Sequence, residues 1–159
     1  MFSILGELAG VSVLDLFAGS GALAIEALSR GASRATLVDS SASAIAAARR
    51  NLETLGLDAD VRRQGVLPFL RNAAVQRRHY DLVFVDPPYR HASSLSDELG
   101  AALEPVLTPD ARVVCESDRR APLHLAPATF SPLAERIYGD TLISIHGPRQ
   151  PHRNLPRNV

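Results

Sequence analysis

The sequence has no lysine and no tryptophan, and it contains one cysteine and one methionine among 159 residues. Because Cys115 is alone, no disulfide can form within the chain, and a reducing, cytoplasmic location is expected. Cys115 lies in an apolar segment and is predicted to be a small core residue rather than a nucleophile. No apolar run approaches the roughly 20 residues that a membrane span requires, and the first residues lack the basic region and cleavage site of a signal peptide.

An excess of charge of either sign is also missing. The 17 basic residues, all of them arginine, balance 17 acidic residues, so the chain exerts no general attraction on nucleic acids. Arginine suits bidentate contacts with phosphate, but an all-arginine inventory can equally reflect genome composition, so single pairs are interpreted as ordinary surface charge. The pairs are Arg49-Arg50, Arg62-Arg63, Arg77-Arg78 and Arg119-Arg120. With 46% hydrophobic and 21% charged residues, the composition is that of one globular domain.

The most informative stretch of the sequence predicts a strand, a glycine turn and a helix in succession. Residues 11–17 predict a buried strand, Gly19 and Gly21 interrupt it, and residues 22–28 are helix formers. Glycine suits a position where the backbone turns sharply or approaches a ligand, and the first N–H groups of the helix point into the same crevice. The pattern indicates a nucleotide-like cofactor at the carboxyl end of a first parallel strand, although such turns also serve packing alone.

A second strand, at residues 35–39, ends in Asp39, about 20 residues after the glycines. This is the spacing of the carboxylate that accepts hydrogen bonds from ribose hydroxyls in dinucleotide-binding folds. An acid at the end of a strand can also be a simple helix N-cap. The spacing favours the ribose role.

Strands and helices alternate along the rest of the chain. Residues 2–8 form a short apolar piece, and residues 147–159, rich in proline and arginine, are predicted to be a disordered tail behind one domain at 1–146. The other predicted elements are helices at 41–55, 67–74 and 94–107, strands at 60–63, 80–85 and 111–116, and a hairpin of 134–138 with 141–145. This order predicts a doubly wound, Rossmann-like α/β fold whose mostly parallel sheet carries an antiparallel C-terminal hairpin strand.

The fourth predicted strand ends in Asp86-Pro87-Pro88-Tyr89. The two prolines lack N–H donors and keep the chain extended, so that carbonyl oxygens stay available beside the Asp86 carboxylate. Together with a flat aromatic face from Tyr89, these acceptors suit a planar group that carries an exocyclic NH2. When acceptors engage both N–H groups of an amine, its nitrogen is favoured in the sp3 state, and its lone pair is free to attack. The alternative is an ordinary strand-ending turn, for which Asp-Pro-Pro is also suitable.

The two segments together resemble those of the S-adenosylmethionine-dependent amino-methyltransferases. The run from Asp15 to Gly21, Asp-Leu-Phe-Ala-Gly-Ser-Gly, and the tetrapeptide at 86–89 carry the resemblance. The longer run at 13–32 and the late Tyr-Gly-Asp-Thr at 138–141 are similar to the bacterial 16S ribosomal RNA guanine-N2 methyltransferases of the RsmD type. The tetrapeptide alone is shared with adenine-N6 and cytosine-N4 enzymes.

The resemblance implies a cofactor site for S-adenosylmethionine and roles for individual residues. Asp39 would hold the ribose hydroxyls with Ser40 nearby, and Asp86 would border both the cofactor and the target amine. Gly65 stands where the family usually has an acid that meets the adenine amino group, so adenine contact would fall to the backbone of Gly65 and Val66. The residues expected around the methionine and ribose are Asp15, Phe17, Ala18, Gly19, Ser20 and Gly21. The residues expected around the amine are Asp86, Pro87, Pro88 and Tyr89, and no metal is implied.

The function implied is methyl transfer to the exocyclic N2 of a guanine in 16S rRNA of the small ribosomal subunit, by a monomer. Members of this family carry a basic, RNA-binding segment ahead of the equivalent of Phe2, and this segment is expected to be missing here. Because the net charge is also zero, weak RNA binding is expected from this chain. The alternatives are adenine-N6 or cytosine-N4 methylation of DNA or RNA, a catalytically silent cofactor-binding module in ribosome assembly, and, ranked low, a nicotinamide dehydrogenase.

Overall fold

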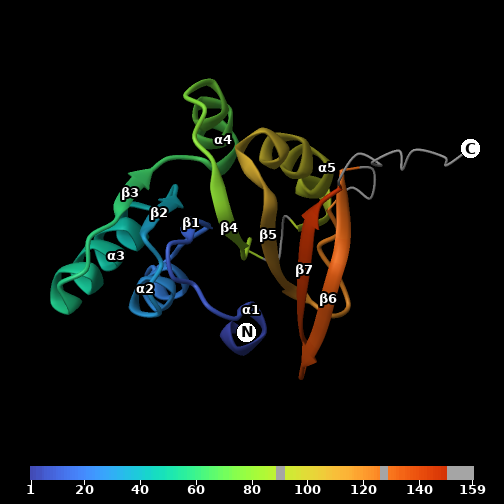
Figure 1. The fold of residues 1–159 in the computed structure, drawn as a ribbon, viewed down its shortest axis with the longest axis horizontal. Coiled ribbons are helices and arrows are strands. Elements are labelled where there is room, and N and C mark those ends of the chain that lie inside the picture. Colours follow the sequence, from blue (N-terminus) through green and yellow to red (C-terminus); the bar gives the residue numbers. More distant parts are fainter. Residues whose placement is uncertain (89–91, 126–128, 150–159) are drawn as a thin grey trace, which may run out of the picture.

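A seven-stranded sheet forms the centre of the molecule in the computed structural model, which describes residues 1–88, 92–125 and 129–149 (Figure 1). The strand order is β3-β2-β1-β4-β5-β7-β6. The strands are β1 Ser12–Leu16, β2 Arg34–Asp39, β3 Asp60–Arg63, β4 Tyr80–Val85, β5 Leu107–Asp118, β6 Phe130–Tyr138 and β7 Thr141–Pro148. The helices are α1 Phe2–Leu5, α2 Ala22–Ser29, α3 Ala42–Leu55, α4 Val66–Val75 and α5 Ala92–Leu103, followed by the 3-10 turn η1 Glu104–Val106.

The first five strands in the sheet order run parallel, whereas β7 is antiparallel to both β5 and β6. All five residues of β1 are buried, as expected of a central parallel strand that is covered on both faces. The predicted fold class is therefore confirmed, including the antiparallel hairpin, whose two-residue turn contains Gly139 with a φ of 62°.

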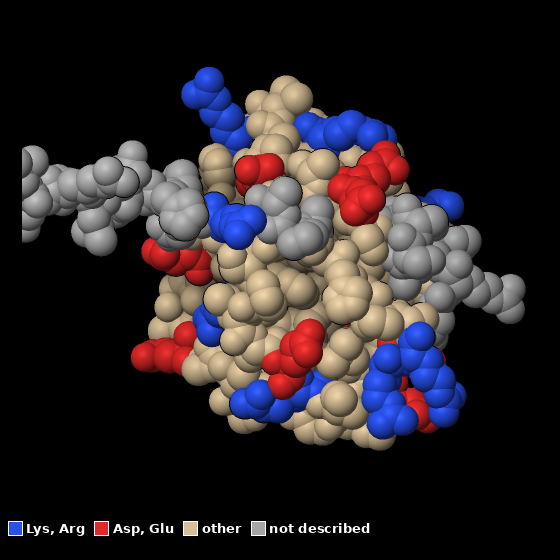
Figure 2. Space-filling model, turned by 90° about the vertical axis from the view of Figure 1, so that its right-hand side faces the viewer, with Lys and Arg blue, Asp and Glu red and all other residues tan. Residues whose placement is uncertain are grey.

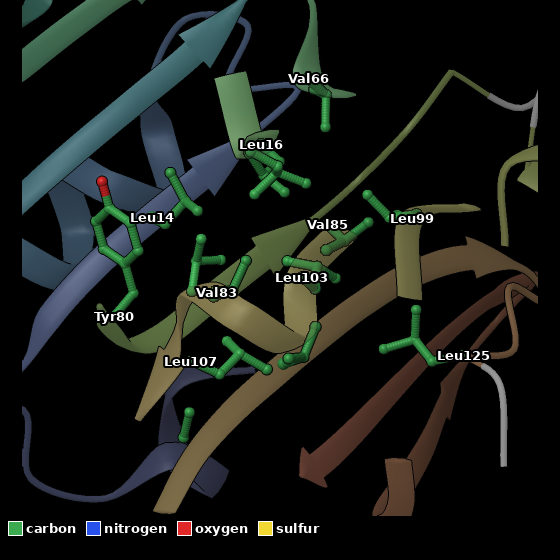
Figure 3. Close-up of a cluster of buried hydrophobic side chains, with 14 of the residues drawn as sticks. Leu14, Leu16, Val66, Tyr80, Val83, Val85, Leu99, Leu103, Leu107 and Leu125 are labelled. Carbon is green, nitrogen blue, oxygen red and sulfur yellow. The ribbon is translucent and has the colours of Figure 1, made fainter. Parts of the chain in front are cut away.

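Helices cover both faces of the sheet, and the sheet separates the core into two clusters. Helices α4 and α5 pack on one face, where the first cluster also takes up strand residues such as Leu14, Val83 and Val85 (Figure 3). The second cluster lies on the opposite face, beneath α1, α2 and α3 (Figure 1). Cys115 belongs to the first cluster, and burial raises the pKa of its thiol to about 12, in agreement with a core role.

Local sequence signals explain several boundaries. The Ser41 hydroxyl accepts a hydrogen bond from the Ala44 N–H and begins α3, and Gly56, with a φ of 64°, ends it. Gly31, with a φ of 98°, follows α2, and the next N–H, of Ala32, bonds back to the Ala27 carbonyl. These predicted helix limits are confirmed.

The predicted helix at 94–107 is wrong at its end. The α-helix ends at Leu103, a 3-10 turn follows, and β5 already begins at Leu107, which pairs with Tyr80. The physical reason is Pro105, which lacks an N–H and cannot continue an α-helix. Strand β5 therefore begins before the predicted strand at 111–116. It also ends two residues later, at Asp118.

The N-terminal end agrees with expectation, whereas the C-terminal end differs from it. The helix at the N-terminus is confined to Phe2–Leu5, within the apolar piece at 2–8. Strand β7 continues through Gly147 and Pro148, two residues that the sequence assigned to the tail, because they pair with Ser131 and Phe130 of β6. Residues 150–159 lie outside the described part of the chain.

The face at the β6 edge of the sheet carries charges of both signs around a largely uncharged centre (Figure 2). Strand β6 contributes three exposed apolar side chains, those of Leu133, Ile137 and Tyr138. Within the described ranges, none of the helices combines the length and the apolar character needed to cross a bilayer.

Candidate active site

The turn between β1 and α2 is built from backbone conformations that few residues adopt. Phe17, Gly19 and Gly21 all have positive φ angles, of 60°, 56° and 82°. The Gly21 N–H donates to the Ala18 carbonyl at 2.8 Å, and the Ala18 N–H donates to the Val38 carbonyl at 3.0 Å. The turn is thus held both internally and by the neighbouring strand β2. A left-handed phenylalanine is uncommon, and no sequence signal pointed to it.

Gly21 is required by space as well as by conformation. A Cβ atom at this position would lie 2.7 Å from Cδ2 of Leu37, whose side chain is completely buried. Around Gly19, by contrast, a Cβ would meet nothing within 4 Å. The turn therefore packs tightly onto the sheet at Gly21 and is open at Gly19.

Asp39 closes the turn from the end of β2. One oxygen of its carboxylate accepts the Gly19 N–H at 2.9 Å, and the other accepts the Ser41 N–H at 2.8 Å. Asp39 thus orders the glycine turn and the approach to α3 at once. A carboxylate offers about four acceptor positions, so these two bonds leave capacity for ribose hydroxyls. Ser40 follows in an exposed position.

Asp15 lies beneath the turn, inside β1, with 2% of its surface exposed. Its carboxylate accepts the Ala24 N–H, from the first turn of α2, at 3.1 Å. Burial raises the pKa of Asp15 to about 7, the Ala24 bond opposes the rise, and the nearby carboxylates of Asp86 and Asp39 add to it. A buried acid with such a pKa, next to a glycine turn, is typical of a functional site.

Asp86 stands directly after β4, at the same edge of the sheet. Strands β1 and β4 are neighbours, and Leu16 pairs with Val85, so the glycine turn and Asp86 begin side by side. Asp86 keeps an exposed surface, yet partial loss of water and the negative charge of Glu116 raise the pKa of its carboxyl to about 6. Pro87 is buried and Pro88 is exposed. Tyr89 lies outside the described residues.

Two further predicted cofactor contacts lie on the adjoining elements. Gly65 is the N-cap of α4, and Val66 is its first residue. The first N–H groups of a helix, here including that of Val66, have no acceptor inside the helix. The Gln64 N–H donates to the Asp39 carbonyl at 2.9 Å, which holds this segment at the end of β2. Ser20 is exposed, and its carbonyl accepts a bond from the Asn51 amide at 3.0 Å. The structure thus brings every described member of the predicted site to one edge of the sheet.

Sequence reasoning missed Glu116. This residue lies in β5, one position beyond Cys115, which pairs with Val85. The signal that could have found it is its place near the carboxyl end of a parallel strand beside the strand that ends in Asp86.

A cavity of about 740 Å3 lies at the other edge of the sheet. Its lining comes from the starts of β2, β3 and β4 and includes Arg34, Arg77 and Tyr80. Ligands of open α/β sheets bind outside the carboxyl ends of the strands, so the geometry places the candidate site at the glycine turn rather than in this cavity.

Comparison with known proteins identifies the family of the chain. The profile of the family described as "Conserved hypothetical protein 95" matches residues 1–147. The chain belongs to this family. Curated relatives confirm the resemblance to RsmD-type methyltransferases.

Curated relatives of this RsmD-type chain include Ribosomal RNA small subunit methyltransferase D from Haemophilus influenzae, 35% identical over 130 residues, which cover 79% of this chain and 66% of the relative. The protein of the same name from Escherichia coli strain K12 is 35% identical over 136 residues, covering 84% and 66%. The chain therefore spans about two thirds of the length of these two relatives. The solved structure of yhhF from Escherichia coli superimposes with a TM-score of 0.80 at 31% identity, covering 94% of this chain and 83% of that one.

Proposed function

We propose that this chain transfers a methyl group from S-adenosylmethionine to the exocyclic N2 amine of a guanine in 16S rRNA. The observation that carries the proposal is the placement of Asp86 and the two following prolines beside the glycine turn, at the carboxyl edge of adjacent strands. Membership of a family with small-subunit rRNA methyltransferases supports the choice of RNA. The target base would leave its stack to reach this edge.

The residues of the turn fit the cofactor. Space is open around Gly19, and Asp39 retains acceptor capacity for ribose hydroxyls. The N–H groups of Ala22 and Leu23 begin α2 at this edge, while that of Ala24 donates to Asp15. Backbone at Gly65 and Val66 would meet the adenine ring in place of an acidic side chain. When bound, the cofactor supplies a methyl group on a positively charged sulfur.

Asp86 and the Pro87 carbonyl would accept the two hydrogens of the amine and orient its lone pair toward the methyl carbon. The N–C bond forms as the S–C bond breaks, and the sulfur leaves as a neutral thioether. The methylated nitrogen then loses one proton, which Asp86 can accept or pass to water. In this proposal Tyr89 stacks on the base.

The test is to replace Asp86 by alanine and to measure cofactor binding and methyl transfer separately. We expect Asp86→Ala to lower transfer to small ribosomal subunits by at least about 100-fold, the usual effect of losing an interaction at the reacting group. Binding of S-adenosylmethionine, followed by calorimetry, should change by less than about threefold because the glycine turn and Asp39 remain. The exposed Asp110, near the start of β5, provides the control variant Asp110→Ala.

Retained transfer by Asp86→Ala would show that Asp86 has no part in the reaction. A wild-type protein that binds the cofactor and labels neither small subunits nor their RNA would instead support the silent module.

A further inference from the structure

The inference concerns Glu116, on β5, and rests on the proposed function. Leu16 pairs with both Val38 and Val85, and Val85 pairs with Cys115. One residue further along each strand lie Asp39, Phe17, Asp86 and Glu116. Side chains of paired positions in a sheet point to the same face, and neighbouring strands are about 4.8 Å apart. Along the sheet edge, the order is therefore the Asp39 carboxylate, the glycine turn, the Asp86 carboxylate and the Glu116 carboxylate.

Glu116 lies on the far side of Asp86 from the glycine turn. Burial is the main cause of the raised pKa of Asp86, and the negative charge of Glu116 adds to it, as expected of two carboxyl groups at neighbouring positions of one sheet edge. Cys115 and Ser117 alternate with Glu116 along β5 and belong to the opposite face. On the other side, Glu116 pairs with Ile143 of β7, an apolar residue that offers no counter-charge.

In the described ranges, neither Asp86 nor Glu116 has a hydrogen-bond or ion-pair partner, although Glu116 is half-buried. Two close, unpaired carboxylates repel each other and are unfavourable in the free protein. A ligand that presents two adjacent donors would remove this repulsion.

Guanine presents such donors. Its N1–H and its N2 amine are neighbours on the Watson–Crick edge, and both donate hydrogen bonds. Adenine and cytosine present an amine next to a ring nitrogen that only accepts, so a carboxylate facing that nitrogen would repel it. Bases that leave the stack are read through this edge.

We propose that Glu116 accepts the guanine N1–H while Asp86 accepts the N2 amine, and that Glu116 thereby selects guanine over adenine and cytosine at this site. Asp86 binds the amine, which all three bases carry, and Glu116 on the neighbouring strand supplies the discrimination. Sites that bind a substrate N–H through a fixed acceptor reject analogues without that N–H much more strongly than apolar pockets do.

The test compares Glu116→Gln with wild type on two substrates, small subunits with the natural target guanine and small subunits in which that guanine is replaced by adenine. Glutamine keeps the length of the side chain, but it is neutral and can donate to the adenine ring nitrogen. We expect transfer to guanine to fall at least tenfold and the preference for guanine over adenine to fall at least tenfold as well. The exposed Glu135, on β6, gives the control Glu135→Gln, which should leave both unchanged.

A smaller fraction of folded protein would reduce transfer to both bases in proportion, so an unchanged preference in Glu116→Gln overturns the role of Glu116 while leaving the proposed function in place. If wild type labels neither substrate, the proposed function fails and this inference fails with it. The two failures are thus distinguishable in one experiment.

Discussion

Among single residues, Asp86 combines the position and the protonation behaviour that the proposed chemistry needs. It sits at the end of a buried strand, keeps an exposed surface, and has a carboxyl group with a pKa raised to about 6. Burial is the main cause, and the negative charge of Glu116 adds to it. At neutral pH such a group is ionised and accepts hydrogen bonds, yet it is basic enough to take up a proton after methyl transfer.

The raised pKa of Asp86 predicts how the rate depends on pH. Only the carboxylate form accepts both the amine hydrogen and, later, its proton, so kcat/KM should be constant well above pH 6. Below pH 6 it should decline about tenfold per pH unit. Asp15 and Glu116 are the carboxyl groups that face Asp86, and removing the charge of Glu116 in Glu116→Gln should shift the inflection to lower pH.

The measurement is kcat/KM for methyl transfer between pH 5 and pH 8, on subunits whose integrity is checked at each pH. A rate that rises as the pH falls below 6 would contradict the role of Asp86 as an acceptor.

At the scale of elements, the turn from β1 to α2 is where local sequence and packing agree most closely. Gly21 combines a φ of 82° with contact against Leu37, so both the backbone and the sheet require glycine. Asp39 connects this turn to the start of α3 by two hydrogen bonds. Hydrogen bonds of the protein itself therefore hold the turn in this conformation.

This predicts a large effect of Gly21→Ala on stability. The added Cβ meets Leu37 and the left-handed backbone becomes unfavourable, so the free energy of unfolding should fall by about 3 kcal/mol. The control Gly56→Ala places alanine in a similar conformation, with a φ of 64° and open space around it, and should cost about 1 kcal/mol. Urea unfolding of the three proteins measures both values. Equal losses in the two variants would show that the contact with Leu37 has no energetic weight.

Elements with strong local signals could be predicted from the sequence, and those decided by pairing could not. Ser41 and Gly56 mark α3 by their own chemistry, and both limits are confirmed. The start of β5 at Leu107 depends on pairing with Tyr80 across the sheet, and the extension of β7 to Pro148 depends on pairing with β6. Nothing local in the chain encodes these partners.

The same distinction applies to the site. The glycine turn, Asp39 and Asp86 stand out through motifs and spacing. Glu116 is brought to Asp86 by the register between β4 and β5, and the left-handed backbone of Phe17 has no sequence signature. The register between strands therefore places site residues that the motifs do not predict.

At the scale of the whole molecule, positive and negative charges balance, while the candidate site residues lie at one edge of the sheet. The net charge is zero, and the face at the β6 edge mixes both signs (Figure 2). Binding that depends on phosphate neutralisation should accordingly be weak and sensitive to salt. Raising the salt concentration should weaken binding to 16S rRNA and to small subunits alike, which a filter-binding titration measures.

The most direct test of the central claim is transfer of labelled methyl from S-adenosylmethionine to small ribosomal subunits from a strain that lacks its own guanine-N2 enzyme. After transfer, the 16S rRNA is digested and the labelled nucleoside is identified, with large subunits as the control substrate. We expect N2-methylguanosine at one position of 16S rRNA and no label in large subunits. Label in N6-methyladenosine or N4-methylcytidine, or no label from a protein that binds the cofactor, would contradict the proposed function.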